Sequence, residues 1–343
     1  MRTSAPSTRS PASPSASAKF RRVRSGSSPR TSPDFAISAF QLFSFSAFPM
    51  SPPTENLTRK QLKADHPTWC PACGDFAVLA SFFNVVQKLG IPHEKIVCVA
   101  GIGCSSRFPY FVNAHGIHFI HGRAVPLATG ISLSRPDLQV FVFGGDGDGY
   151  SIGGNHLTHA ARKNVNLCYV IMDNCVYGLT KNQTSPTTPV GRATKTDPRG
   201  AIDRPVNPMA QLISSGATFI ARTHAAQVKH MNEMFERAIL HPGFAVVETL
   251  SECTMFYPGA FDAANPRKGG NFDLVDEEHQ NLESTAAAMA LAEEDFPGKF
   301  GVYLEKRRPT KNELERQWIE DARSRTPDLS ERDLLRQRFA RMR

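Results

Sequence analysis

Four apolar runs, each ending in glycine or polar residues, constrain the fold of this chain most strongly. They are "KIVCVAGIG" (95–103), "LQVFVFGGDGDG" (138–149), "NLCYVIMDN" (166–174) and "FAVVETLSEC" (244–253). Continuous Val, Ile and Phe without polar alternation is typical of strands that are buried on both faces of a sheet. Segments with helical spacing, such as "FAVLASFFNVVQKLG" (76–90), lie among the runs. The pattern predicts an α/β fold in which helices cover both faces of a parallel sheet.

The first 49 residues differ in composition from the rest of the chain. They contain thirteen serines and six prolines, so the segment cannot bury enough apolar surface to fold, and we expect a disordered extension. It is either a targeting segment, since it is rich in Arg and Ser, or the result of a mis-assigned start, with translation beginning at Met50. We favour the second origin. We expect a cofactor-binding domain over 50–300 and a charged helical tail over 301–343.

The net charge of +8 comes from the two ends of the chain. Residues 1–49 carry +6 and residues 301–343 carry +4, so residues 50–300 carry −2. The body therefore has no basic excess, and we expect no nucleic-acid partner. The apolar run 35–48 is too short to span a membrane, and we expect a cytoplasmic protein without membrane contact. The seven cysteines, an odd number, favour reduced thiols over a disulfide framework.

Two oxygen-bearing side chains follow neighbouring predicted strands. Asp146 comes after the strand expected at 138–143, and Asn174 comes 28 residues later, after the strand expected at 166–172. In such folds, ligands bind beyond the carboxyl ends of the strands. Hard oxygen ligands and nearby glycine amides suit a Mg²⁺ ion that bridges a diphosphate. A calcium loop is disfavoured because Leu157 stands where its fixed Glu should be. We expect Asp148 to order the loop and not to bind metal.

Four cysteines are placed to act together. Cys70 and Cys73 form a C-x-x-C, and Cys104 and Cys253 end two of the predicted strands. The C-x-x-C alone suits half a zinc site, a redox dithiol or half an iron–sulfur site. Four thiolates at one edge would suit either Zn²⁺ or a [4Fe-4S] cluster. The other cysteines have no such placement, and we expect those in the apolar strands to pack in the core.

Several motifs together resemble those of one protein family. Residues 145–187, "GDGDGYSIGGNHLTHAARKNVNLCYVIMDNCVYGLTKNQTSPT", resemble the thiamine-diphosphate motif of the beta subunits of 2-oxoacid:ferredoxin oxidoreductases. "HPTWCPACGDF" (66–76), "GIGCSSRFPYF" (101–111) and "HGRAVPLATGISLSRPDL" (121–138) resemble further motifs of the same family. The resemblance covers roughly residues 66–260. Two departures are visible, because Ala72 and Asn182 stand where the family usually has glycine.

The resemblance implies a thiamine-diphosphate-binding (diphosphate-domain) fold and specific site residues. The residues implied to bind thiamine diphosphate are His121, Gly145, Asp146, Gly147, Asn174, Val176 and Gly178. Asp146, Asn174 and the backbone of Val176 would hold Mg²⁺, and Cys70, Cys73, Cys104 and Cys253 would hold one [4Fe-4S] cluster. The residues implied to bind substrate are Arg107, Leu179 and Lys181.

The implied reaction is the coenzyme A-dependent oxidative decarboxylation of a 2-oxo acid to an acyl-CoA and CO₂. Electrons would pass through the cluster to ferredoxin, and the loop "YGLTKNQ" (177–183) favours 2-oxoglutarate as the substrate. The catalytic Glu of such enzymes would come from a separate alpha subunit. A cluster-free thiamine-diphosphate decarboxylase or synthase subunit is one alternative, but it leaves the four cysteines unexplained. A zinc-stabilised interaction protein is another, and it leaves Asp146 and Asn174 unexplained.

Overall fold

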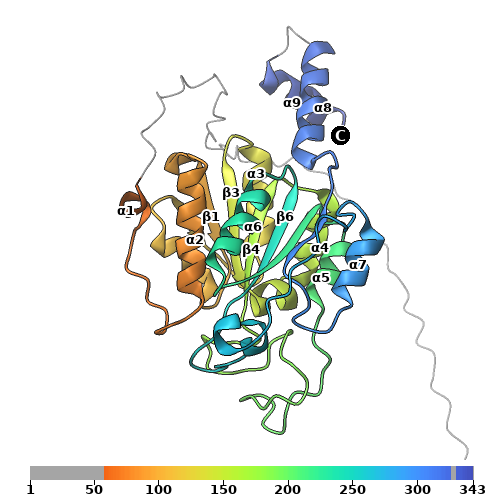
Figure 1. The fold of residues 1–343 in the computed structure, drawn as a ribbon. Helices are drawn as coiled ribbons and strands as arrows, with labels where there is room; N and C mark the ends of the chain where they lie inside the picture. The colour runs from red at the N-terminus through yellow and green to blue at the C-terminus, as the bar shows by residue number, and fades with distance from the viewer. Residues whose placement is uncertain (1–57, 326–329, 343) are drawn as a thin grey trace, which may run out of the picture. The chain divides into compact units, whose positions relative to one another are not determined.

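A computed structural model describes residues 58–325 and 330–342 of the protein, so the extension predicted over 1–49 lies outside the described residues. Within them, seven strands form one sheet in the order β2-β1-β3-β4-β6-β5-β7 (Figure 1). The strands are β1 Ile96–Ala100, β2 His115–His118, β3 Gln139–Gly145, β4 Leu167–Asp173, β5 Phe219–His224, β6 Phe244–Leu250 and β7 Gly301–Glu305. Neighbours pair in parallel, except that β7 runs antiparallel to β5.

The four apolar runs form the centre of this sheet. They become β1, β3, β4 and β6, which are adjacent in the strand order, and nearly every residue in them is buried. The α/β fold with a largely parallel sheet is thus confirmed. The other three strands were not predicted: β2 is short and partly exposed, β5 contains Arg222 and His224, and β7 has five residues next to a charged segment.

The boundary expected at residue 300 falls inside the sheet-forming part of the chain. Gly301–Glu305 is a strand of the sheet, and its first four residues are buried. The helical part of the tail comes later, as α8 Lys311–Arg325 and α9 Glu331–Ala340. α8 begins on the body, because Asn312 Oδ1 accepts a hydrogen bond from the Asn166 amide at 2.9 Å. Asn166 precedes β4, so α8 starts at the amino ends of the strands.

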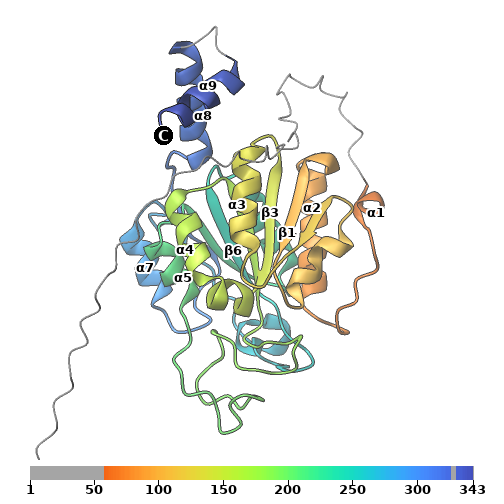
Figure 2. The ribbon, with the colours of Figure 1, turned by 180° about the vertical axis from the view of Figure 1, so that it is seen from behind.

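Helices cover both faces of the sheet, as predicted. α2 Asp75–Lys88 and α6 Val228–Leu240 pack on one face (Figure 1). On the opposite face lie α3 Ala124–Ser134, α4 Gly154–Lys163, α5 Pro208–Ser214 and α7 Thr285–Ala292 (Figure 2). Each face has its own apolar core, and the first contains an aromatic cluster in which Phe108 stacks on Phe143 at 3.7 Å between ring centroids. Cys98 and Cys168 lie in this core, as expected.

Short elements complete the described chain. They are α1 Arg59–Leu62, the 3₁₀ turns η1 His93–Lys95, η2 Ser105–Phe111, η4 Asp262–Ala264 and η5 Pro266–Lys268, and the π-helical turn η3 Gly147–Ile152. Both η2 and η3 follow directly after candidate site residues, Cys104 and Asp146. Among the described residues, no helix combines the length and the apolar character that crossing a membrane requires.

A buried ion pair joins β5 to β6. Arg222 Nε donates to Glu248 Oε2 at 2.6 Å, and both side chains are buried. The pair reaches beyond the two strands, because Tyr150 Oη donates to Glu248 Oε1 at 3.2 Å and Arg222 Nη1 donates to the Pro297 carbonyl at 2.5 Å. The turn η3, which follows Asp146, is thereby tied to the centre of the sheet.

We predict that Glu248→Leu destabilises the protein strongly. The substitution leaves the Arg222 guanidinium buried without its counter-charge, which typically costs about 3–5 kcal/mol. Denaturant unfolding of the full chain measures the change in the free energy of unfolding. Asp137→Ala is the matched control, because it breaks the exposed pairs with Lys95 and Arg135, and such pairs contribute only about 0.2–1 kcal/mol. Equal losses in the two variants would contradict the prediction.

Candidate functional site

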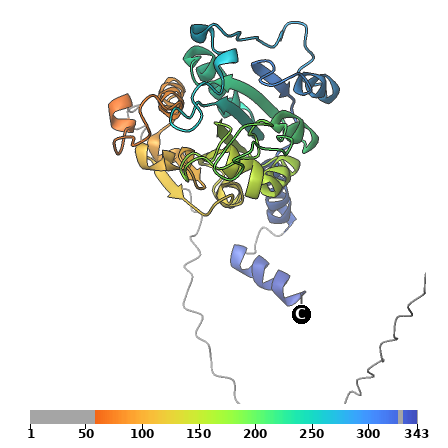
Figure 3. The same cartoon turned by 90° about the horizontal axis from the view of Figure 1, so that it is seen from below.

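The predicted cofactor residues meet at the carboxyl edge of the sheet, which Figure 3 views from below. All seven line one cavity of about 130 Å³: His121, Gly145, Asp146, Gly147, Asn174, Val176 and Gly178. Cys104 and Leu179 line it as well. The volume is below the roughly 300–1,000 Å³ of typical small-molecule sites. The cavity in this chain therefore encloses only part of a ligand as large as thiamine diphosphate.

Two buried carboxyl groups lie side by side at this edge. Thr187 Oγ1 lies 2.8 Å from Asp146 Oδ2 and 2.8 Å from Asp173 Oδ1, and bridges the two side chains. Burial raises the pKa of both carboxyl groups, and the Asp146 charge raises that of Asp173 further. Asp173 Oδ2 is buried without a hydrogen-bond partner. Desolvated carboxylates of this kind are stabilised by a cation, so the donor set fits Mg²⁺.

The turn after β4 brings the remaining oxygen ligands to the cavity. Asn174 Oδ1 accepts a hydrogen bond from the Val176 amide at 3.1 Å, and Cys175 between them has a φ of +56°. The chain turns sharply at Cys175 because this residue is left-handed. Asn174 and Val176, on either side of it, both line the cavity. Asn174 and Val176 thus lie in the same cavity as Asp146, where the sequence analysis placed them, although their bond to each other was not predicted.

Two glycines in the cavity wall lie close to other groups. A Cβ atom at Gly147 would lie 2.1 Å from Cε1 of the Tyr177 ring, so no side chain fits there. A Cβ atom at Gly178 would be at ordinary contact distance from two predicted thiols, 3.4 Å from Cys253 Sγ and 3.8 Å from Cys104 Sγ. The cavity wall at Gly178 therefore lies next to Cys253, and Cys104 lines the cavity itself. The cofactor residues and the cysteines belong to one site.

The four cysteines lie at the rim of this site. Cys73, Cys104 and Cys253 are close enough for their charges to interact, and so are Cys70 and Cys104. Burial is the main cause that raises the pKa of Cys104 to about 12. Within residues 58–325 and 330–342, no three Cys, His, Asp or Glu side chains are grouped closely enough to hold one metal ion.

Four thiols in one region are a donor set for two kinds of metal centre. A single Zn²⁺ ion takes its sulfur ligands at about 2.3 Å, whereas a [4Fe-4S] cluster takes each thiolate on a different iron. The four cysteines therefore fit either centre.

Hydrogen bonds between distant segments hold the cysteine-bearing loops together. Trp69 Nε1 donates to the Cys104 carbonyl at 2.7 Å, and Ser251 Oγ donates to Asp75 Oδ1 at 2.6 Å. The loop after β4 also takes part, because the Arg192 guanidinium lies 3.3 Å from the centroid of the Tyr257 ring. These residues were not predicted, since nothing in a single sequence indicates which distant segments will pack together.

Two departures from the family's glycine pattern occur at left-handed residues. Ala72 has a φ of +62° and Asn182 has a φ of +73°. Glycine adopts such a conformation without strain, which explains the usual residue at both positions. Asn is among the few other residues that tolerate it, whereas Ala72 is strained by roughly 1 kcal/mol. The chain retains the glycine-type turns without the glycines.

The predicted substrate residues are less closely grouped than the cofactor residues. Leu179 lines the cofactor cavity and also a neighbouring cavity of about 460 Å³, which Arg107 lines with His66 and His118. Lys181 lines neither cavity and is exposed. Within the described chain, the structure therefore places Leu179 and Arg107 beside the cofactor cavity but does not bring Lys181 to it.

Asp148 orders the loop around the cavity, as expected. Its Oδ1 accepts hydrogen bonds from the Ile102 amide at 2.9 Å and from the Gly122 amide at 2.8 Å. The same oxygen lies 2.6 Å from His121 Nδ1. Asp148 thus connects the segments that follow β1, β2 and β3. Its contact with His121 was not predicted.

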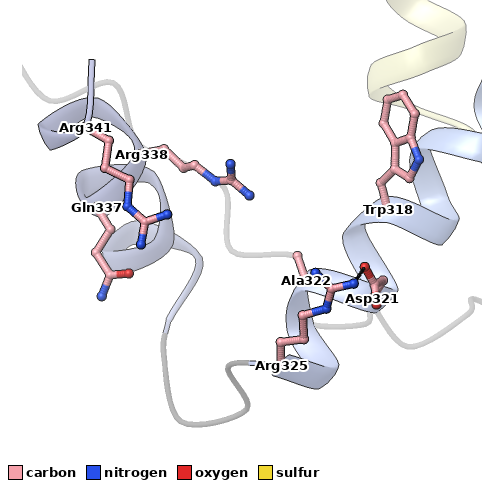
Figure 4. Close-up of a pocket in the computed structure, with 7 residues that line it drawn as sticks. All are labelled: Trp318, Asp321, Ala322, Arg325, Gln337, Arg338 and Arg341. Carbon is pink, nitrogen blue, oxygen red and sulfur yellow. Dashed lines mark ion pairs between the residues drawn. The ribbon is translucent and has the colours of Figure 1, made fainter. Parts of the chain in front are cut away.

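A cavity of about 380 Å³ lies elsewhere, between α8 and α9 (Figure 4). Its lining residues are Trp318, Asp321, Ala322, Arg325, Gln337, Arg338 and Arg341. Arg325 pairs with Asp321 at 2.6 Å across one turn of α8. No residue predicted for cofactor, metal or substrate lines this cavity.

Several known proteins are similar to this chain in sequence. Residues 98–249 match the family described as thiamine pyrophosphate enzyme, C-terminal TPP binding domain. The chain is 48% identical over 207 residues to the 2-oxoglutarate oxidoreductase subunit KorB of Mycobacterium tuberculosis, covering 60% of this chain and 55% of that protein. It is 36% identical over 243 residues to the 2-oxoglutarate synthase subunit KorB of Methanocaldococcus jannaschii, covering 70% of this chain and 88% of that protein.

A solved structure shares the fold. A chain of the 2-oxoglutarate:ferredoxin oxidoreductase from Magnetococcus marinus superposes with a TM-score of 0.74 at 38% identity, covering 82% of this chain and 96% of that one. Coverage of the relatives varies, and the chain spans 65% of a 2-oxoacid:ferredoxin oxidoreductase beta subunit from Saccharolobus solfataricus that is 45% identical. From this likeness across most of the described residues, we conclude that the chain belongs to the family of 2-oxoacid:ferredoxin oxidoreductase beta subunits.

Proposed function

We propose that this chain is the beta subunit of an enzyme that oxidatively decarboxylates a 2-oxo acid and passes the electrons to ferredoxin. One observation carries the proposal: the cavity lined by all seven predicted cofactor residues is also lined by Cys104, and its wall at Gly178 lies next to the thiol of Cys253. An organic cofactor that becomes electron-rich would thus lie directly beside a one-electron acceptor. The names of the relatives agree with this function.

The residues that would hold the diphosphate group are those around Asp146. The side chains of Asp146 and Asn174 and the Val176 carbonyl would bind Mg²⁺, and the amides of Gly145 and Gly147 would face the phosphate oxygens. When bound, thiamine diphosphate supplies a carbon nucleophile that stores the electron pair left by the departing CO₂. This chain would hold the diphosphate in place. Because Gly178 has no side chain, the cofactor would also lie close to the thiols.

The residues that would hold a [4Fe-4S] cluster are Cys70, Cys73, Cys104 and Cys253. When bound, such a cluster would supply a one-electron acceptor. Trp69 and the bond between Ser251 and Asp75 hold the cysteine-bearing loops at fixed separation. The final acceptor that we propose for the electrons is ferredoxin.

The substrate we propose is 2-oxoglutarate, with coenzyme A as the acceptor of the acyl group. Arg107 and Leu179 line the cavity next to the cofactor cavity, and a guanidinium is a suitable partner for a substrate carboxylate. Lys181 would join them if the loop around it moves on binding. The solved relative was obtained with 2-oxoglutarate, coenzyme A and succinyl-CoA bound, which supports this choice.

We further propose that an alpha subunit completes the active site and that the enzyme acts in the cytoplasm. The cavity of about 130 Å³ is too small to enclose the whole cofactor, so other surface has to cover the rest. The alpha subunit would also supply the Glu that activates the cofactor. This chain alone is then expected to show no turnover.

We predict that Asp146→Ala abolishes binding of thiamine diphosphate. Removing a metal ligand should weaken the cofactor's affinity by at least about 100-fold. Loss of a residue that only supports a metal ligand already costs up to about 100-fold. Titration calorimetry of the complex with its alpha subunit, in the presence of Mg²⁺, measures the affinity. Asp137→Ala removes an exposed carboxylate away from the cavity and should leave the affinity unchanged. Unchanged affinity in the Asp146 variant would contradict the proposed site.

We predict about four irons and about four acid-labile sulfides per chain in the complex purified without oxygen, as one cubane cluster requires. Cys253→Ala should lose the cluster and its visible absorption. Cys168→Ala alters a cysteine buried in the core and should retain both. Stoichiometric zinc in place of iron would favour the zinc-stabilised alternative. Thiamine binding without iron or sulfide would favour a cluster-free decarboxylase.

A further inference from the structure

An imidazole and a carboxylate form a hydrogen-bonded pair in the cofactor cavity. His121 Nδ1 lies 2.6 Å from Asp148 Oδ1. Both residues line the cavity, but their exposure differs: the Asp148 side chain is 2% exposed and the His121 side chain is 35% exposed. The carboxylate is thus enclosed by protein, whereas the imidazole borders the space in which a ligand would bind.

The surroundings of Asp148 fix its position. Its Oδ1 accepts from the amides of Ile102 and Gly122 in addition to its contact with His121. Its Oδ2 lies where glycines make room, because a Cβ atom at Gly101 would be 2.1 Å from this oxygen and one at Gly144 would be 3.3 Å from it. Backbone donors on one side and close backbone on the other prevent the carboxylate from turning away from His121.

The fixed carboxylate determines how His121 uses its two nitrogens. Asp148 Oδ1 already acts as an acceptor for two backbone amides, and in the same role it faces the hydrogen on His121 Nδ1. Nε2 is then the nitrogen that can exchange a proton with a molecule in the cavity. The Tyr177 ring lies edge-on to the imidazole, with 6.3 Å between the ring centroids and an interplanar angle of 75°, and limits its rotation. This arrangement of acceptor, imidazole and open site is the one that acid–base catalysts use.

We propose that His121 carries protons to and from the substrate and that Asp148 is its positioning residue. The proposal rests on the proposed function and deepens it, because it gives His121 a task beyond contact with the cofactor. The site must move a proton twice. The keto oxygen of the 2-oxo acid becomes a hydroxyl when its carbonyl carbon is attacked, and it must become a carbonyl again when the acyl group leaves.

The proton balance of the two steps can be followed on Nε2. In the first step, the proton on Nε2 passes to the keto oxygen as the new carbon–carbon bond forms. The bond to the carboxylate carbon then breaks and CO₂ leaves. Once the electron pair left by CO₂ has been removed in two one-electron steps, the hydroxyl becomes a carbonyl again, and Nε2 takes back its proton. This returns His121 to its starting state. The sulfur of coenzyme A would then bond to the carbonyl carbon as the carbon–carbon bond to the cofactor breaks, with the electron pair returning to the cofactor carbon and the thiol proton released to solvent.

The test compares His121→Ala and Asp148→Asn in the complex with the alpha subunit. We expect His121→Ala to lower kcat with 2-oxoglutarate by about 10²–10⁴-fold, the usual contribution of a general acid–base residue. Added imidazole should restore part of that rate, which a structural role for the side chain would not allow. Asp148→Asn should lower kcat with little change in KM, and the double variant should be no slower than His121→Ala, because the two residues act as a unit.

Two further measurements do not depend on turnover. Affinity for thiamine diphosphate should stay within about threefold of the unsubstituted enzyme in both variants, far less than the effect of losing a metal ligand. The ¹⁵N spectrum of the labelled histidines should assign the hydrogen of His121 to Nδ1, and Asp148→Asn should perturb that signal. The control is His279→Ala, since His279 also pairs with a carboxylate, Asp276, at 2.8 Å, but both side chains are exposed. This variant should keep the full rate.

The outcomes separate this proposal from the proposed function. If the unsubstituted complex binds no thiamine diphosphate, both fail. If it binds the cofactor and turns over, but His121→Ala keeps the full rate, the proton-carrying role is overturned and the enzyme assignment stands. Loss of rate together with loss of cofactor affinity, without rescue by imidazole, would likewise overturn the role and leave His121 as a cofactor contact.

Discussion

Buried negative charge at the carboxyl edge of the sheet is the constraint on which the rest of the site depends. Asp75, Asp146, Asp148, Asp173 and Glu248 are each at most 3% exposed, and a buried carboxylate is costly unless other groups compensate its charge. Glu248 has Arg222, and Asp148 has two amides and His121. Asp146 and Asp173 share the Thr187 hydroxyl, and Asp173 also accepts from the Cys175 amide. These neutral donors do not offset the charge of two carboxylates, so the proposed Mg²⁺ ion would be stabilised beside this pair.

The parallel sheet explains why this charge, the glycines and the thiols occur together. Parallel strands end at the same edge, so residues after β1, β3, β4 and β6 meet there although they lie far apart in the sequence. Gly178 belongs to the cavity wall, and a Cβ atom there would be in ordinary contact with the thiols of Cys253 and Cys104. A short path between the proposed cofactor and the proposed cluster would therefore follow from the strand order, which brings these segments to one edge.

Much of this arrangement could be predicted from the sequence, because the signals were local. The apolar runs indicated the four central strands, and the residues directly after them were expected at one edge. Contacts between residues that lie far apart in the sequence could not be predicted in this way. The strand β7 needs β5 beside it to be recognised, Trp69 needs the Cys104 carbonyl, and His121 needs Asp148. Lys181 was predicted to bind substrate because of the motif around it. In the structure, Lys181 and Asn182 form a left-handed turn, and the Lys181 side chain does not line the cavity.

The shape of the cavity also indicates where specificity resides. The groups that we propose to hold a diphosphate and a metal come from this chain. The cavity they line is only about 130 Å³, and Leu179 also lines a second cavity together with Arg107. A site built in this way separates two tasks. Its buried part is specified by charge and by close backbone contacts, so it tolerates little variation. Its outer part is bounded by the side chains of Leu179 and Arg107 and by the alpha subunit that we propose covers it. The choice among 2-oxo acids would then be made at the interface between the subunits. The same cofactor chemistry can then serve different substrates without any change around Asp146.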